Sequence, residues 1–233
     1  MAQQPNKPGG EPKGRLIVLE GLDGSGKATQ AGLLVQSLAA RGLPVRGITF
    51  PNYKSDSSAL VRMYLAGAFG SHPGDVNAYA ASAFYAVDRY ASYKANWGGF
   101  YAAGGILVAD RYTTSNAVHQ CAKLPKAGWD GFLDWLFHFE YAQLGIPAPD
   151  RVLYLRVDPA VSQRLLAARY AGDEGKKDIH ERDAAYLAQS RAAADYCAAR
   201  FGWRTIECAA GQGIRPAGEI GQEILQIVLE GSG

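Results

Sequence analysis

Residues 16–30 constrain this chain most, because an apolar run leads through a glycine-rich turn into a segment with helical spacing. The turn fits the pattern G-x-x-x-x-G-K, with Gly21, Gly26 and Lys27 at its fixed positions. The backbone N–H groups of such a loop wrap a di- or triphosphate while the lysine ammonium reaches the outer phosphates. The helix that follows points the positive end of its dipole at the same anion. We therefore expect a nucleotide phosphate site here; the alternative is an ordinary strand-to-helix turn.

Position 28 departs from the usual form of this loop. A Ser or Thr hydroxyl normally contacts Mg²⁺ there, but the sequence has Ala28. Thr29 does not replace it, because the next residue lies about 100° further around the helix. A metal would then be held through water, by the nucleotide itself, or by another carboxylate.

The length and composition limit what the rest of the chain can be. A chain of 233 residues is long enough for one α/β domain with at most a small lid. We expect a disordered tail over residues 1–14 and a single domain over residues 15–233. A net charge of +2 gives no reason to expect nucleic-acid or membrane binding. The three cysteines are scattered, which predicts reduced thiols. The sequence has no apolar run long enough to span a bilayer and no signal core, so we expect a cytoplasmic protein.

Segments with strand and helix patterns alternate along the chain. The expected strands are residues 15–20, 45–50, 105–109, 151–157 and 203–208. The expected helices are residues 27–40, 57–67, 77–97, 114–121, 129–144, 160–168, 181–200 and 215–229. Short apolar strands separated by helices predict a parallel sheet covered on both faces, with ligands bound at the carboxyl ends of the strands.

The polar residues that follow the third strand form a second chemical centre. Asp110 ends an apolar strand beside the phosphate loop, where a carboxylate could hold Mg²⁺ or its waters. Arg111 offers a planar fork suited to a second phosphate. The alternative is a helix-capping aspartate followed by a surface arginine.

Two further segments carry unusual charge. Asp88 and Arg89 lie among aromatic residues, which suggests a planar ligand gripped at its edge and stacked on its face, or else simple core packing. Residues 164–182 are glycine-bearing and highly charged, which suggests a lid that brings cations over a transferring phosphoryl group. A surface loop, free or binding another protein, is the alternative for that segment.

Taken together, these motifs resemble the thymidylate kinase family over about residues 15–230. The matching segments are residues 21–30, Phe50-Pro51, Asp88-Arg89, Asp110-Arg111-Tyr112 with Ser115-Asn116, and Asp178-Ile179-His180-Glu181. The resemblance implies a P-loop NTPase three-layer fold, with a five-stranded parallel sheet of order 2-3-1-4-5 and a short helical lid. It also implies transfer of the γ-phosphoryl group of ATP to dTMP with Mg²⁺, by a homodimer, in pyrimidine deoxynucleotide synthesis.

The resemblance also implies roles for individual residues. The donor loop would comprise Gly21, Gly24, Ser25, Gly26, Lys27, Ala28 and Thr29. Asp23 would face the acceptor's sugar and phosphate, Arg111 would bind that phosphate, and Asp110 would lie near the metal. The acceptor pocket would be lined by Phe50 and Pro51, plausibly joined by a cis peptide bond, by Tyr85 on the base ring, and by Arg89, Asn116 and His119. Arg169 is the first candidate for a lid arginine, followed by Arg164 and Lys177.

Some positions leave the substrate open. His119 stands where the family usually has a tyrosine that crowds the 2′ side of the sugar, and Tyr85 replaces a more common phenylalanine. A pocket with an arginine and an asparagine could accept other pyrimidines, since one methyl group is worth only about 1–3 kcal/mol. The alternatives are another nucleotide or deoxynucleoside kinase on this scaffold, or a nucleotide-binding protein without catalysis.

Overall fold

A five-stranded parallel sheet of order β2-β3-β1-β4-β5 forms the centre of the molecule, as predicted. The computed structural model describes residues 14–157, 161–162, 179–180, 183–210 and 213–230. The strands are β1 Arg15–Glu20, β2 Val45–Thr49, β3 Ile106–Asp110, β4 Arg151–Arg156 and β5 Arg204–Glu207. Leu19 of β1 is in register with Asp110 of β3, so the phosphate loop and Asp110 leave the sheet at the same edge.

The helices follow the predicted order with shifted boundaries. They are α1 Lys27–Ala39, η1 Asp56–Ser58, α2 Ala59–Leu65, η2 Pro73–Asp75, α3 Ala78–Ser92, η3 Tyr93–Trp97, α4 Gly98–Ala102, α5 Thr113–Cys121, η4 Lys126–Gly128, α6 Trp129–Phe137, η5 His138–Gln143, α8 Ala184–Phe201 and α9 Ala217–Glu230. The helices predicted at 77–97 and 129–144 each end in a π-helical turn, η3 and η5. The helix predicted at 160–168 lies outside the described residues except for 161–162. A short hairpin, β6 Ala209–Ala210 with β7 Gly213–Ile214, was not predicted.

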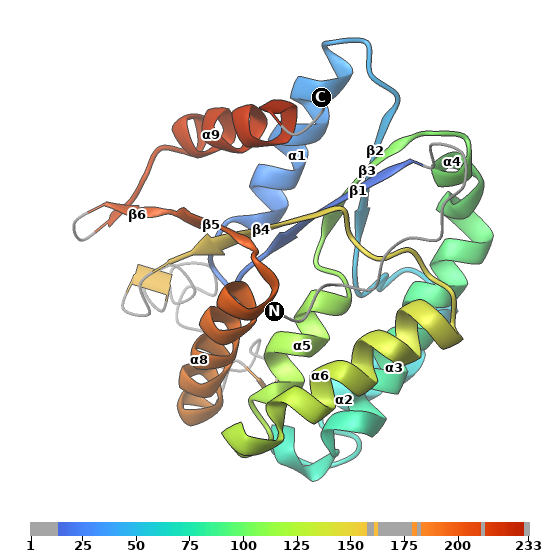
Figure 1. Cartoon of the computed structure of the whole chain (residues 1–233). Coiled ribbons are helices and arrows are strands. Elements are labelled where there is room, and N and C mark those ends of the chain that lie inside the picture. Colours follow the sequence, from blue (N-terminus) through green and yellow to red (C-terminus); the bar gives the residue numbers. More distant parts are fainter. Residues whose placement is uncertain (1–13, 158–160, 163–178, 181–182, 211–212, 231–233) are drawn as a thin grey trace.

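Helices cover both faces of the sheet, α1 and α9 on one side and α3, α5, α6 and α8 on the other (Figure 1). Strand β1 shows why both faces need covering. Leu16 and Val18 pack into one hydrophobic core, while Ile17 and Leu19 pack into the other. A strand with no polar face is stable only between two layers, which explains its continuous apolar sequence.

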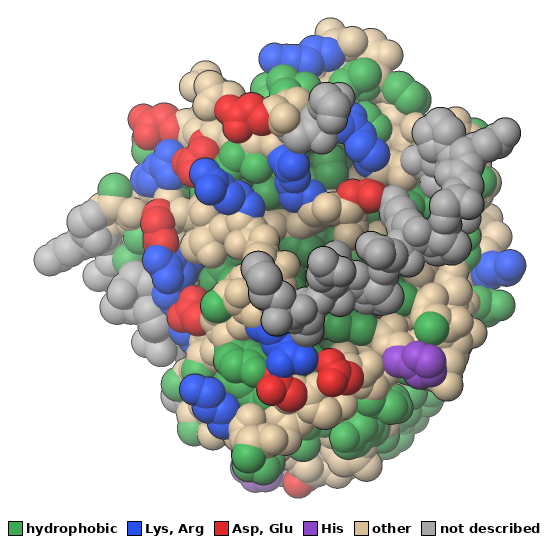
Figure 2. Space-filling view, viewed as in Figure 1, with side chains coloured by type: hydrophobic (Ala, Val, Ile, Leu, Met, Phe, Trp, Pro, Cys, Tyr) green, Lys and Arg blue, Asp and Glu red, His purple; other side chains and the backbone are tan. Residues whose placement is uncertain are grey.

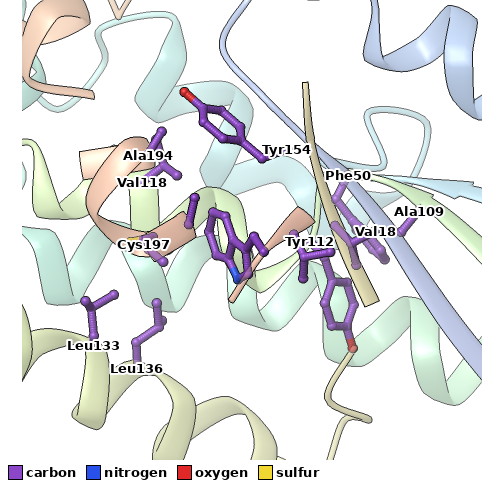
Figure 3. Close-up of a cluster of buried hydrophobic side chains, with 14 of the residues drawn as sticks. Val18, Phe50, Ala109, Tyr112, Val118, Leu133, Leu136, Tyr154, Ala194 and Cys197 are labelled. Carbon is purple, nitrogen blue, oxygen red and sulfur yellow. The ribbon is translucent and has the colours of Figure 1, made fainter. Parts of the chain in front are cut away.

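The core on the α5 side fixes the helix that follows Arg111. Figure 3 shows Val118 of α5 beside Leu133 and Leu136 of α6 and Cys197 of α8, all buried. Dense packing of this kind restricts movement of the helix, so the polar side chains on its other face are held in place. All three cysteines are buried and free, as expected for reduced thiols.

The surface of the described chain carries charges of both signs, as expected from the composition. Acidic and basic side chains are interspersed on the face shown in Figure 2. Within the described part of the chain, every helix is too short or too polar to cross a bilayer. Gly14, which falls within the span expected to be a tail, is buried, and its N–H donates to the carbonyl of Tyr101 at 2.8 Å.

Candidate functional site

The glycine-rich loop between β1 and α1 has the shape that its sequence predicts. Gly26 caps α1 in the left-handed region, at φ 85°. A Cβ on Gly21 would lie 2.6 Å from Ser25 Oγ and 2.8 Å from the Leu155 carbonyl oxygen, so a side chain at Gly21 would clash. The loop therefore needs glycine at both positions to leave its backbone N–H groups open to an anion.

Lys27 lies inside the loop and not on its surface. The residue is 7 % exposed, and Nζ donates to the carbonyl of Leu22 at 2.8 Å. Burial, followed by the nearby Arg111, lowers the pKa of Lys27 to about 8, although Asp23 and Glu20 act in the opposite direction. The hydroxyl of Ser25 is buried and has no hydrogen-bond partner among the described residues.

Arg111 connects the loop to the end of β3. It is the one non-glycine residue in the described part of the chain with a positive φ, 68°, and such strain is concentrated at functional sites. Its guanidinium forms an ion pair with Asp23 and lies 3.2 Å from His119 Nε2 and 3.3 Å from Ser115 Oγ. Burial alone would raise the pKa of Asp23, but Arg111, Lys27 and His119 hold it well below its ordinary value.

Glu20 supports the same region and was not predicted. Its carboxylate is fully buried and accepts hydrogen bonds from the hydroxyls of Thr114 and Ser115 at 2.6 and 2.8 Å, and from the N–H of Gly21 at 2.9 Å. It thus ties the start of the loop to α5. The signal was in the sequence: a charged residue directly follows the apolar run of residues 16–19.

Asp110 has the environment of a metal-binding carboxylate. Its Oδ1 is buried and has no hydrogen-bond partner among the described residues. No cluster of three or more His, Cys, Asp or Glu side chains occurs in that part of the chain. Mg²⁺ usually takes one or two carboxylates together with substrate phosphates and waters, so a single free carboxylate fits this ion.

Arg89 forms a buried ion pair with Glu140. Its Nε and Nη2 donate to the two carboxylate oxygens at 2.7 and 2.5 Å, and both side chains are at most 1 % exposed. Burial lowers the pKa of Arg89, but Glu140 outweighs it and raises the pKa above the ordinary value. Glu140 was not predicted, because a single glutamate between Phe139 and Tyr141 gives no periodic signal.

Asp88, the neighbour of Arg89 in sequence, bonds to the loop after β2. It accepts hydrogen bonds from the N–H of Asn52 at 2.8 Å and the hydroxyl of Ser57 at 2.6 Å. The adjacent Phe50-Pro51 peptide bond is cis, as the resemblance implied. Asp88 therefore anchors the segment that brings Phe50 and Pro51 to the site.

One cavity of about 1240 Å³ brings most of the predicted residues together. Its lining includes Asp23, Gly24, Gly26, Lys27, Ala28, Thr29, Phe50, Pro51, Tyr85, Arg89, Asp110, Arg111, Asn116 and His119. Gly21 and Ser25 lie in the same loop but outside this lining. Arg169, Arg164 and Lys177 lie outside the described residues, so the structure places none of the predicted lid cations.

Gln120 also lines this cavity and was missed by sequence reasoning. It is fully buried, and neither its amide oxygen nor its amide nitrogen has a partner among the described residues. Its spacing of four residues from Asn116 on α5 places both on one helix face, which is the signal that could have identified it.

Aromatic rings close the cavity next to Arg111. His119 stacks on His180 at 5.8 Å and on Tyr186 at 6.1 Å between ring centroids. His180 Nε2 lies 2.7 Å from the hydroxyl of Tyr64. Burial, followed by Lys123, lowers the pKa of His180 to about 3, so the ring is neutral at ordinary pH.

Comparisons with known proteins agree with this geometry. The sequence profile of the thymidylate kinase family matches residues 19–216. A thymidylate kinase of Mycobacterium tuberculosis is 31 % identical over 195 residues, covering 81 % of this chain and 87 % of the relative. One from Synechococcus is 29 % identical over 229 residues, covering 94 % and 97 %, and the human one is 31 % identical over 149 residues, covering 64 % and 63 %.

The fold agrees as well. A solved structure of thymidylate kinase from Candida albicans superposes with a TM-score of 0.70 at 21 % identity, covering 94 % of this chain and 92 % of that one. The profile match extends over most of the chain and includes the phosphate loop, Arg89, Asp110 and Arg111. This chain belongs to the thymidylate kinase family.

Proposed function

We propose that this protein transfers the γ-phosphoryl group of ATP to dTMP, giving ADP and dTDP. One observation carries the proposal: the phosphate loop and Arg111 line the same cavity and are joined by the Asp23–Arg111 ion pair. Two anions bound at these points would meet head to head. That is the arrangement that phosphoryl transfer requires, because its catalysis consists mainly of positioning and charge stabilisation.

The donor end of the cavity would be the loop. Its N–H groups and Lys27 would bind the ATP phosphates. An anion beside Lys27 favours its charged form and would offset the lowering effect of burial on its pKa. Binding of the nucleotide and protonation of Lys27 would therefore support each other.

The acceptor phosphate would be bound by Arg111. The planar guanidinium suits a phosphate, and its present partner Asp23 is 25 % exposed at the cavity. An incoming phosphate would share the guanidinium with Asp23. The same guanidinium would then stabilise negative charge on the oxygens of the group in transfer.

The base would lie at the deep end of the cavity, near Arg89. Tyr85 would stack on the ring, and Arg89 would donate to a carbonyl oxygen of the base. Asn116 and Gln120 line the same cavity, and the amide of Gln120 has no hydrogen-bond partner among the described residues. An amide offers one donor and one acceptor, which matches the adjacent N–H and carbonyl of a thymine or uracil edge.

The metal would be Mg²⁺, held by Asp110 together with phosphates and waters, since Ala28 offers no ligand. Bound Mg²⁺ would neutralise charge on the transferring phosphates. The chain would position it through Oδ1 of Asp110, which has no hydrogen-bond partner in the part of the chain that the structure describes.

Two further elements belong to the proposal. Residues 164–182 would act as a lid, with Arg169 as the first candidate for its catalytic cation and Arg164 and Lys177 next.

A homodimer is supported by large apolar side chains exposed on α2 and α3. They are Leu60, Met63, Val87 and Tyr90, each 39–52 % exposed.

The experiment is a panel of acceptors in an assay of ADP formation from ATP. We expect Mg²⁺-dependent turnover with dTMP, weaker turnover with dUMP, and little with UMP, dCMP or thymidine. Equal turnover of UMP and dTMP would contradict the proposed substrate. ADP formation that does not depend on an acceptor, or none at all, would contradict the kinase function.

A further inference from the structure

Glu140 is a buried carboxylate for which the proposed reaction has no use. It is fully buried and does not line the cavity, whereas its partner Arg89 does. Its two oxygens accept from Nε and Nη2 of Arg89 at 2.7 and 2.5 Å. Glu140 can reach a ligand only through partners that line the cavity, which are Arg89 and, more weakly at 3.4 Å, Asn116.

Three segments meet at this carboxylate. Arg89 comes from α3, Glu140 from the π-helical turn η5, and Thr113 and Asn116 from α5. The hydroxyl of Thr113 donates to Glu140 Oε2 at 2.9 Å, and Nδ2 of Asn116 lies 3.4 Å from Oε1. Glu140 thus fixes where Arg89 lies relative to the helix that lines the other side of the base region.

The ion pair also determines which nitrogen of Arg89 is left for a ligand. Nε and Nη2 both donate to Glu140. Nη1 is the remaining nitrogen, and it lies 3.5 Å from the carbonyl oxygen of Tyr112.

Glu140 also balances the charge of Arg89. Tyr112 and Tyr141 are the other ionisable groups close to Arg89, and burial raises the pKa of both, so they stay neutral. Glu140 is thus the counter-charge of Arg89 within the described part of the chain.

We propose that Glu140 is a positioning residue for base recognition: it fixes the Arg89 guanidinium edge-on to the acceptor base and cancels its charge, so that the pocket prefers a neutral carbonyl edge to an ionised base. A buried cation without its counter-charge would instead favour an anion. The inference rests on the proposed function, because it places the base at the Arg89 end of the cavity.

The test compares Glu140→Gln with wild-type protein on two acceptors, dTMP and 5-fluoro-dUMP, whose ring N–H ionises much closer to neutral pH. With wild-type protein, we expect the KM for 5-fluoro-dUMP to rise as its base ionises. With Glu140→Gln, the KM for dTMP should rise about tenfold with kcat within about twofold, since base contacts change little in the transition state. The KM for 5-fluoro-dUMP should then fall as the pH rises.

Two further variants keep the test decisive if Glu140→Gln folds poorly. Glu140→Asp keeps the charge but withdraws it by one methylene, and should raise the KM for dTMP while retaining the wild-type pH trend. The double variant Arg89→Gln/Glu140→Gln removes both buried charges, so neither is left unpaired and the fold is protected. Its KM for dTMP should be close to that of Arg89→Gln alone, because Glu140 acts through Arg89.

Asp134→Asn is the matched control, since this carboxylate lies on the preceding helix α6 and is 71 % exposed. It should leave both KM values unchanged. An unchanged KM for dTMP in folded Glu140 variants, or a wild-type pH trend in Glu140→Gln, would overturn the inference. Absence of dTMP turnover by the wild-type protein would instead remove the proposed function itself, so the two failures are distinguishable.

Discussion

Arg111 and Arg89 line the same cavity but are held in opposite ways. Arg111 is 17 % exposed, has a left-handed backbone, and shares its guanidinium among Asp23, Ser115 and His119. Arg89 is 1 % exposed and is paired with a single carboxylate through one edge. The first can exchange partners when a phosphate arrives, whereas the second is fixed before any ligand binds. In the proposed reaction, the phosphate end of the site would therefore be adaptable, and the base end would be preorganised.

Substitutions at the phosphate end should mainly lower kcat, whereas substitutions at the base end should mainly raise the KM for dTMP. The largest of these effects should come from Lys27→Ala, at the phosphate end. Removing the ammonium inside the phosphate loop should lower kcat by more than about 10³-fold, because charge stabilisation dominates phosphoryl transfer. The side chain leaves a small buried space, so the fold should survive, as circular dichroism and thermal unfolding would show. Residual kcat above one tenth of the wild-type value would contradict the role of the loop.

Arg111→Gln should have the next largest effect. It removes the cation that we place between the two phosphates, so kcat should fall about 10²- to 10³-fold and the KM for dTMP should also rise. Arg111→Lys restores charge without the planar fork, and should recover only part of the loss. A change confined to KM would mean that Arg111 binds the acceptor without stabilising the transition state.

At the base end, Arg89→Gln should raise the KM for dTMP about 30-fold and change kcat by less than about threefold, because its contacts are the same in ground and transition states. Steady-state kinetics at saturating ATP would measure both. A loss in kcat alone would show that the base-edge role is wrong, and would remove the contrast with Arg111.

Some parts of the fold and of the site could be predicted from the sequence, and others could not. The parallel sheet, the loop at Gly21 to Lys27 and the placement of Asp110 and Arg111 at the strand ends were predictable from strand patterns and glycines, whereas the strand order came from the family resemblance. Glu140 was not, because its role comes from burial beside Arg89, a residue far away in the sequence. The lid prediction at residues 164–182 stays a prediction, since Arg169 lies outside the described residues.

His180, whose ring stacks on that of His119 next to Arg111, should make the stability of the protein depend on pH. The pKa of His180 is lowered from 6.5 to about 3, so below pH 6.5 the unfolded chain binds a proton that the folded chain does not. The free energy of unfolding should therefore fall by about 2 kcal/mol between pH 7.5 and pH 5 on account of this residue. Thermal unfolding of His180→Gln, which can still accept from Tyr64, should show a loss smaller by this amount. The same pH dependence in both proteins would contradict a buried neutral imidazole.

The smallest expected effect concerns Lys27, whose pKa is lowered to about 8, mainly by burial and by Arg111. The ammonium of the free protein should lose its proton as the pH rises through 8, so the affinity for ATP should fall about tenfold between pH 7 and pH 9. Calorimetric titration with a non-hydrolysable ATP analogue would measure this. Lys27→Arg should bind more weakly but without the alkaline fall, since its charge does not titrate in this range. Arg89 cannot show such a limb, because Glu140 raises its pKa further above the ordinary arginine value. A fall of the same size in Lys27→Arg would place the titrating group elsewhere, and would contradict Lys27 as the source of the pH dependence.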